Sequence, residues 1–304
     1  MTPPNSMTEV APVTFMSYNS TGINSVKCKW ICDVCDDFEV DYLCIQEHFK
    51  KTKTIDKFFR ENFPKFSSYV IPGYRAPGQD TGRCKAGLAQ LSSKSYSIKK
   101  DRVTTNGFRI QAQLLSMPTC KILWLNTYMP TDPLRVNDYD DADLREVLVE
   151  VEAILTDCSY TDIIWAGDLN WDMSRVTKFS RTMAAFMDGL GLVSLWSEHP
   201  VKYTYLHTDY KSMSVLDHFM LSPRLLDLVE GCGVVERGDN LSGHCPIWVS
   251  LRLGSLPLKK QVKSAKPEEL ANQRSFRGSK TFRGISKTKR MTQPKLGVGI
   301  TIGC

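Results

Sequence analysis

The chain has 304 residues, and its hydrophobic share of 42% and aromatic share of 10% are typical of a folded globular protein. It contains no apolar run near the ~18 residues that a membrane-spanning helix needs. Its polar, proline-rich beginning (MTPPNSMTEVAP) lacks the basic and apolar regions of a secretory signal peptide. We therefore expect a protein of the nucleus or the cytoplasm that is neither secreted nor bound to a membrane.

The net charge of +6 is spread unevenly. Of the 39 basic and 33 acidic residues, 12 and 2 lie in residues 255–304, so the preceding residues hold 27 basic and 31 acidic side chains. The last segment, with Lys259 and Lys260 near its start, shows little hydrophobic periodicity and is typical of a disordered basic tail. Such a tail contacts nucleic acid non-specifically, carries a nuclear import signal at Lys287–Arg290, or is a solvated linker.

Ten cysteines are scattered along the sequence, and in this context we expect reduced thiols rather than disulfides. Cys28, Cys32 and Cys35 share one face of a predicted helix, and Cys44 is the nearest fourth candidate for a zinc site. Burial of small apolar side chains explains the same spacing more simply.

Hydrophobic periodicity predicts many strands with helices between them. The predicted strands are Val13–Asn19, Tyr42–Glu47, Phe66–Ile71, Leu88–Leu91, Ser95–Lys99, Arg109–Leu115, Lys121–Tyr128, a strand from Ile163, Val193–Trp196, Tyr203–Tyr205, Val215–Leu221 and Gly243–Leu253. The predicted helices are Ser25–Phe38, Thr54–Asn62, Asp143–Leu155 and Phe179–Leu190, the last capped by Gly191. Strands often follow strands directly, which favours an α/β or α+β domain with sheets packed face to face and helices outside. We expect a flexible segment at residues 1–12, one folded domain at 13–253 and the tail at 254–304.

The stretch Ile163–Trp171 joins a buried strand to a polar turn. Gly167 lets the backbone turn, and Asp168 and Asn170 follow it. Residues i and i+2 of a strand point to the same face, so this acid and this amide would stand side by side. The pair suits a water or a phosphate oxygen beside a metal ion; an Asx turn that caps the strand is the alternative.

Other predicted strands also end on polar residues that suit phosphate chemistry. These are Asn19, Glu47, Tyr128, Asp217 with His218, and Ser242 with His244. Each alone has an ordinary explanation as a turn, a solvated strand end or a core residue. Their common position at the ends of buried strands is what indicates a shared site.

Six segments carry a resemblance to a known family. They are Tyr18-Asn19, Ile45-Gln46-Glu47, Asn126–Pro130, Gly167–Asn170, Leu216–His218 and Ser242–Pro246. Together they resemble the endonuclease/exonuclease/phosphatase (DNase I-like) superfamily over residues 13–253. Leu216–Phe219 and Tyr203–Tyr205 are most similar to the apurinic/apyrimidinic-type endonuclease domain of LINE-type (non-LTR) retrotransposons. The resemblance implies a four-layer α/β/β/α sandwich of two mostly antiparallel sheets with helices outside.

The resemblance also implies hydrolysis of a phosphodiester with Mg²⁺, which Mn²⁺ can replace, and no other cofactor. In that family pattern Glu47 binds the metal with Asn19 beside it, and Asp168 orients and deprotonates the attacking water. Such a metal neutralises charge and activates water or the leaving oxygen.

The remaining positions of the pattern surround the phosphate. Asn170 and Tyr128 would hold phosphate oxygens, and His244, oriented by Asp217, would stabilise the charge of the transition state. Two hydroxyl residues would give supporting hydrogen bonds: Thr204 and Ser242.

The sequence departs from the family at Ser242-Gly243-His244, where Ser-Asp-His is usual. A carboxylate expected near the metal is missing, and Asp239 lies four residues earlier. Loss of an outer ligand weakens metal affinity or activity by roughly 10–100-fold.

Three functions stay open at this point. The first is a DNA endonuclease that nicks a target duplex to leave a 3′-hydroxyl, as in retrotransposon integration. The second is an inositol-phosphate-type phosphatase, and the third is an inactive copy that only binds nucleic acid because of Gly243. Five cationic residues are candidates for nucleic-acid contacts: Arg75, Arg83, Lys85, Lys259 and Lys260.

Overall fold

The computed structural model describes residues 11–51, 54–75, 84–96, 98–133, 141–207 and 212–255. Arg83, Lys259, Lys260, most of the expected N-terminal segment and nearly all of the expected tail lie outside the described residues. Within the described part, every helix is too short or too polar to cross a lipid bilayer.

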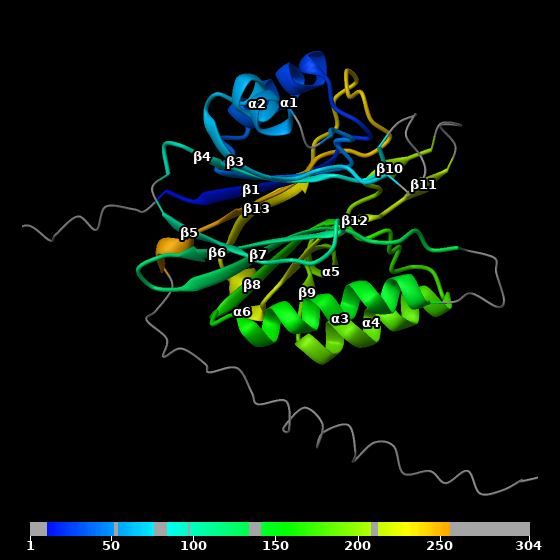
Figure 1. The fold of residues 1–304 in the computed structure, drawn as a ribbon. Coiled ribbons are helices and arrows are strands. Elements are labelled where there is room, and N and C mark those ends of the chain that lie inside the picture. Colours follow the sequence, from blue (N-terminus) through cyan, green and yellow to red (C-terminus); the bar gives the residue numbers. More distant parts are fainter. Residues whose placement is uncertain are drawn as a thin grey trace, which may run out of the picture. The chain divides into compact units, whose positions relative to one another are not determined.

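Two six-stranded sheets form the centre of the fold (Figure 1). The first sheet has the order β13 (Val229–Val234), β14 (Ile247–Leu251), β1 (Val13–Asn19), β2 (Tyr42–Gln46), β4 (Leu88–Ser93) and β3 (Phe66–Ile71). The second has the order β5 (Lys99–Val103), β6 (Ile110–Ser116), β7 (Lys121–Tyr128), β8 (Asp162–Asp168), β12 (Asp217–Leu221) and β9 (Val193–Ser194). In each sheet only the central pair is parallel, β1 with β2 and β7 with β8, so the prediction of mostly antiparallel sheets is confirmed.

The helices lie on the outer faces of the two sheets, as Figure 1 shows. The first sheet is covered by α1 (Ser25–Asp37) and α2 (Ile55–Asn62), and the second by α3 (Ala142–Asp157) and α4 (Lys178–Leu190). The described residues also include short helices at α5 (Leu195–Glu198), α6 (Pro223–Leu226) and the 3₁₀ turn η2 (Leu253–Ser255). A small hairpin of β10 (Tyr205–Leu206) and β11 (Met213–Ser214) stands apart from both sheets.

Local sequence explains where the long helices begin and end. The side chains of Asn24 and Thr177 cap α1 and α4 by accepting backbone N–H groups of the first turn. Gly191 ends α4 in the left-handed conformation, with a φ of 63°, as predicted.

Apolar side chains fill all three interfaces between the four layers. Between the sheets, Trp124 packs edge-on against Phe15 and Tyr42, with ring centroids 6.1 and 5.2 Å apart. All three side chains are fully buried, and burial of each contributes on the order of 2–3 kcal/mol.

A layer of buried amides also joins the two sheets. Gln46 Nε2 donates to Asn126 Oδ1 at 2.7 Å and to Ser17 Oγ at 2.9 Å, and Asn126 Nδ2 donates to Gln111 Oε1 at 3.1 Å. Hydrogen-bonded amides between sheets fix one relative register, because slippage would leave buried polar groups without partners. Gln46 and Asn126, noted in the sequence as neighbours of Glu47 and Tyr128, thus anchor the strands that carry them.

The structure corrects four predicted strands. The strand predicted at Ser95–Lys99 is found at Lys99–Val103, Val193–Trp196 is half strand and half helix, the strand at Tyr203–Tyr205 is Tyr205–Leu206, and the strand at Gly243–Leu253 spans Ile247–Leu251. For the cysteines of α1, the one close group of three metal-binding side chains found in the described part contains no cysteine, and Cys28 and Cys35 are buried, which agrees with the burial explanation.

Candidate active site

The ends of β1 and β8 meet through a direct contact between their last residues. Asn19 Nδ2 donates to Asp168 Oδ2 at 2.8 Å, which joins one sheet to the other. The second carboxylate oxygen, Oδ1, accepts the backbone N–H of Asn170 at 3.0 Å. Burial raises the pKa of Asp168 to about 7, against the opposing effect of His244. A fixed carboxylate with a pKa near neutrality suits a general base.

Glycine is required just before this carboxylate. Gly167 has a φ of 146°, and a Cβ atom there would collide with the carbonyl oxygen of Thr127 on the parallel strand β7. Asn170 also has a left-handed backbone, with a φ of 46°, and its Nδ2 donates to the Met129 carbonyl at 2.9 Å. The predicted pair is therefore both an Asx turn, through Asp168 Oδ1, and part of the polar site.

His244 and Asp217 form the second polar pair. His244 Nδ1 lies 2.9 Å from Asp217 Oδ2, and its other ring nitrogen, Nε2, lies 3.8 Å from Asp168 Oδ2. Burial disfavours a charge on His244, but the carboxylates of Asp217 and Asp168 outweigh that effect and raise the pKa of the imidazole to about 9. At neutral pH the site thus holds an oriented imidazolium between two carboxyl groups.

The two hydroxyl residues position these groups. Thr204 Oγ1 accepts the backbone N–H groups of Leu216 and Asp217, both at 2.9 Å, and so fixes the start of β12. Ser242 Oγ donates to the Asn19 carbonyl at 2.9 Å and accepts the N–H of His244 at 3.2 Å. The supporting roles expected for Thr204 and Ser242 stay predictions that these contacts do not test.

Glu47 and Tyr128 occupy the neighbouring part of the site. Glu47 follows β2 with a left-handed φ of 54°, and Tyr128 ends β7. The pKa of Tyr128 is raised, first by burial and then by the nearby Glu47 carboxylate, so its hydroxyl stays a hydrogen-bond donor. Arg109 was missed as a site residue: its guanidinium lies 5.5 Å from the Tyr128 ring and donates to the Tyr128 carbonyl at 3.2 Å.

The carboxylates of the site bear on whether it could hold a divalent metal. Among the described residues, the one close group of three acidic or histidine side chains is Asp168, Asp217 and His244, whose atoms contact one another. Thr21 and Ser242 place hydroxyl oxygens 2.9 Å apart, while Gly243 has no side chain. Mg²⁺ commonly uses one or two carboxylates and completes its shell with water and substrate phosphate. A metal bound at Glu47, as the sequence resemblance implies, would therefore need water and substrate oxygens to complete its shell.

The predicted cationic contacts are only partly described. Lys85 is exposed, and its backbone exchanges two hydrogen bonds of 2.8 Å with Tyr74. This bridge closes the base of the Gly73–Gly87 loop, which also carries Arg75.

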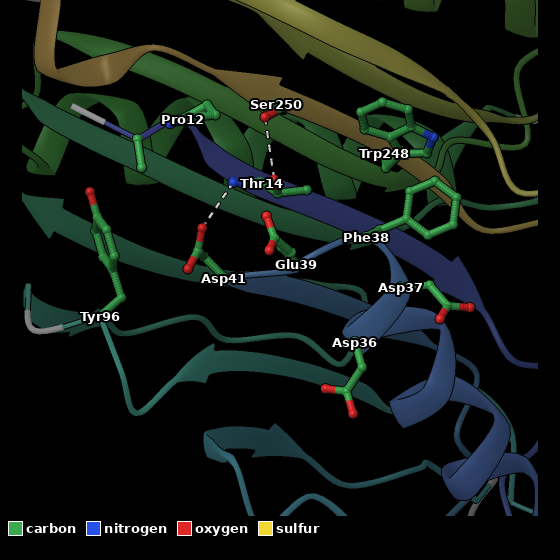
Figure 2. A pocket seen from close by; sticks show the side chains of 11 residues that line it. Pro12, Thr14, Asp36, Asp37, Phe38, Glu39, Asp41, Tyr96, Trp248 and Ser250 are labelled. Atoms are coloured by element: carbon green, nitrogen blue, oxygen red, sulfur yellow. Dashed lines mark hydrogen bonds between the residues drawn. The ribbon is translucent and has the colours of Figure 1, made fainter. Parts of the chain in front are cut away.

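A hollow with an acidic wall lies at the beginning of β1 (Figure 2). Its wall includes Glu39, Asp41 and the aromatic residues Phe38 and Trp248. Asp41 Oδ2 accepts the backbone N–H of Thr14 at 3.0 Å, so this carboxylate is engaged in holding the start of β1. The polar site described above lies at the other end of β1.

No family model and no curated protein matches the sequence. Solved structures do resemble the fold. An AP endonuclease from Leishmania major aligns with a TM-score of 0.62 at 18% identity, over 80% of this chain and 88% of that chain. The endonuclease domain of TRAS1, a telomere-specific non-LTR retrotransposon, aligns with a TM-score of 0.55 at 15% identity, over 82% of this chain and all of that domain (100%).

A 3′ phosphatase from Neisseria, bound to a product DNA hairpin, aligns with a TM-score of 0.60 at 16% identity, over 79% of this chain and 99% of that chain. Identities this low speak for the fold and not for one activity. The chain therefore has the DNase I-like fold, a four-layer α/β/β/α sandwich with its polar strand ends gathered at one site.

Proposed function

We propose that the chain is a metal-dependent phosphodiesterase, and that it acts as a DNA endonuclease which nicks one strand and leaves a 3′-hydroxyl. The observation that carries the proposal is the contact network of Asn19, Asp168, His244 and Asp217. It holds a base and an imidazolium 3.8 Å apart, beside the Glu47–Tyr128 pair. Both kinds of group are needed when water attacks an anionic phosphodiester.

The residues divide the work in the following way. Asp168 accepts a proton from the attacking water, and its orientation is kept by Asn19 and Asn170. His244, charged and hydrogen-bonded to Asp217, stabilises the negative charge that grows on the phosphate oxygens. A preset donor of this kind is worth roughly 3–4 kcal/mol of transition-state stabilisation.

Glu47 would hold Mg²⁺ or Mn²⁺, and that ion would neutralise charge on the phosphate and on the leaving oxygen. The Tyr128 hydroxyl, which stays protonated, donates to a phosphate oxygen on the same side. Because the protein supplies one carboxylate here, we expect the apparent metal affinity to rise when nucleic acid is bound.

The similar folds support DNA as the substrate. Two of the proteins described above are an AP endonuclease and the endonuclease domain of a non-LTR retrotransposon, and a third is bound to a DNA hairpin. In a retrotransposon setting, the 3′-hydroxyl left by the nick would prime reverse transcription at the target.

A supercoiled-plasmid assay tests the proposal. Wild-type protein with Mg²⁺ or Mn²⁺ should give nicked circles, EDTA should stop the reaction, and a DNA polymerase should extend the nicks directly because they end in a 3′-hydroxyl. Asp168→Asn and Glu47→Gln keep the size of each side chain and should each slow nicking by at least about 100-fold, or 2.7 kcal/mol. Equal nicking by wild type and both variants would show that the activity comes from elsewhere.

Phosphatase activity is the second candidate, because a 3′ phosphatase shares the fold. Release of inorganic phosphate from a 3′-phosphorylated oligonucleotide or an inositol phosphate, with no plasmid nicking, would favour it. DNA binding without either reaction would instead identify an inactive copy. Gly243 motivates this third outcome, since it leaves no carboxylate at the position where the resembled family usually has one.

A further inference from the structure

An aromatic and cationic stack leads away from the candidate active site. The rings of Tyr74 and Phe108 lie parallel, with centroids 4.6 Å apart and an interplanar angle of 4°. The Arg109 guanidinium lies 5.3 Å from the Phe108 ring and 5.5 Å from the Tyr128 ring. These contacts form a row that runs from Tyr74 through Phe108 and Arg109 to Tyr128, whose hydroxyl lies near Glu47.

The two outer rings are held on anchored backbone. The N–H groups of Asn106 and Gly107, just before Phe108, donate to Glu150 Oε1 of α3 at 2.6 and 3.0 Å. Tyr74 is fixed by its two backbone hydrogen bonds with Lys85. Rings positioned in this way lose little further conformational entropy when a ligand stacks on them.

Part of the aromatic stack is exposed to solvent, and positively charged side chains lie beside it. Tyr74 is 37% exposed although its ring pairs face to face with Phe108. In the part of the chain that the structure describes, no carboxylate lies within ion-pair distance of Arg109, and the exposed Lys85 adjoins Tyr74. An exposed aromatic ring beside cationic side chains is the combination that binds unpaired bases together with their phosphates.

We propose that Tyr74, Phe108 and Arg109 bind an unpaired nucleobase next to the phosphate that is cut. The unpaired base stacks on the Tyr74 ring. Arg109 contacts the backbone phosphate that lies between this base and the scissile phosphate, which Tyr128 holds. This inference rests on the proposed function and adds a substrate class: DNA in which a base near the nick is unstacked or single-stranded. A fully paired duplex keeps its bases inside the helix and gains nothing from this stack.

Binding without cleavage tests the idea. Wild-type protein in EDTA is titrated with a DNA duplex that carries one unpaired 2-aminopurine, and with the same duplex fully paired. Stacking on Tyr74 should quench the fluorescence of the unpaired base. Tyr74→Ala should bind the unpaired-base duplex about ten-fold more weakly and abolish the quenching, while its affinity for the paired duplex stays within two-fold.

Matched variants separate stacking from folding. Tyr74→Phe keeps the ring and should bind like wild type, and Phe108→Leu, which keeps apolar bulk without a ring, should behave like Tyr74→Ala. Thermal unfolding midpoints should stay equal across the set. Equal loss of affinity for both duplexes, or quenching that persists in Tyr74→Ala, would overturn the inference. Absence of nicking by wild type rejects the proposed endonuclease activity instead, because the fluorescence titration is scored without metal.

Discussion

The ring of Tyr205 lies where a side chain on Gly243 would begin. A Cβ atom built on Gly243 would stand 2.9 Å from Tyr205 Cε2 and 3.1 Å from the Leu206 carbonyl oxygen. The same ring packs on His244, with centroids 4.6 Å apart. The hairpin β10–β11 also contacts Gly243 through the hydrogen bond from Leu206 N to the Gly243 carbonyl, at 2.8 Å. The space beside Gly243 is therefore set by this hairpin.

A carboxylate side chain at position 243 should therefore be poorly tolerated on its own. We expect Gly243→Asp to destabilise the fold by about 1–3 kcal/mol, because the new side chain overpacks against Tyr205. In a Tyr205→Ala background the same change should cost at least about 1 kcal/mol less, as a double-mutant cycle of urea unfolding would measure. An equal cost in both backgrounds would mean that the ring does not limit this position.

The double variant should also bind metal more tightly. Gly243→Asp in the Tyr205→Ala background should bind Mn²⁺ at least about ten-fold more tightly than Tyr205→Ala alone, since a second carboxylate joins Glu47. Isothermal titration without nucleic acid measures this directly. Unchanged affinity would place the metal away from residue 243.

Thr204 should influence the proposed reaction through the backbone of Leu216 and Asp217. Thr204→Val has nearly the same shape but leaves the two N–H groups of Leu216 and Asp217 without their acceptor. Nicking should fall by roughly 10–100-fold with little change in substrate affinity. Thr204→Ser, which keeps the acceptor, should retain most activity; a similar loss in the serine variant would argue that the methyl group matters more than the hydroxyl.

Gly167 should tolerate no side chain. Gly167→Ala should destabilise the fold by more than about 3 kcal/mol, because a Cβ atom meets the Thr127 backbone at a φ of 146°. Gly189→Ala is the matched control: nothing lies within 4 Å of its Cβ position in α4, so it should stabilise by about 0.5–1 kcal/mol. Chemical unfolding of both variants gives the comparison.

His48 should make the fold sensitive to mild acid. It is buried beside Glu47, with Nδ1 accepting the Lys50 N–H at 3.0 Å and Nε2 lying 2.9 Å from the Ile71 carbonyl, which fits a neutral ring. Burial lowers the pKa of His48 to about 4, from 6.5. The unfolded chain then binds more protons between these values, so the contribution of His48 is complete above pH 6.5 and is lost as the pH falls toward 4.

The size of this loss is up to roughly 3 kcal/mol, given 1.36 kcal/mol for each pKa unit. Unfolding free energies measured in EDTA at pH 7 and pH 4.5 should fall less steeply for His48→Gln than for wild type. Parallel pH curves for the two proteins would exclude His48 as the source.

Strong hydrophobic periodicity made much of the fold predictable. The amphipathic pattern of α3 and the apolar runs of β1, β7 and β8 gave correct elements, because their burial depends on local spacing. The edge strand β5, with the sequence KKDRV, was placed four residues early, since charged edge strands carry no apolar alternation.

Other elements depend on residues distant in the sequence and could not be predicted from local patterns. Strand β13 contains Gly231 and Gly233, which indicate a loop in sequence, yet the Trp248 ring of the next strand covers both glycines. Helix α5 lies inside the segment predicted as a strand, because the Ser194 hydroxyl caps it by accepting the Trp196 N–H at 3.2 Å.

The candidate site shows the same division. Asn19 and Asp168 stand at the ends of the buried strands β1 and β8, and His244 lies three residues before β14, so short motifs beside apolar runs suggest all three as site residues. Tyr205 and Arg109 were not, because their importance comes from packing on His244 and Tyr128 across the fold. An aromatic or cationic residue at a strand end carries no such signal in a single sequence.

The pairing of β1 with β14 sets the order in which the protein can mature. Val13 of β1 lies opposite Leu251 of β14, so β1 lacks this neighbouring strand until nearly the whole domain has left the ribosome. Ser242 Oγ donates to the Asn19 carbonyl, so these two residues, 223 positions apart in the sequence, meet only in that last step. The proposed site is thus completed late in synthesis, and a chain that stops before β14 should lack the proposed nuclease activity.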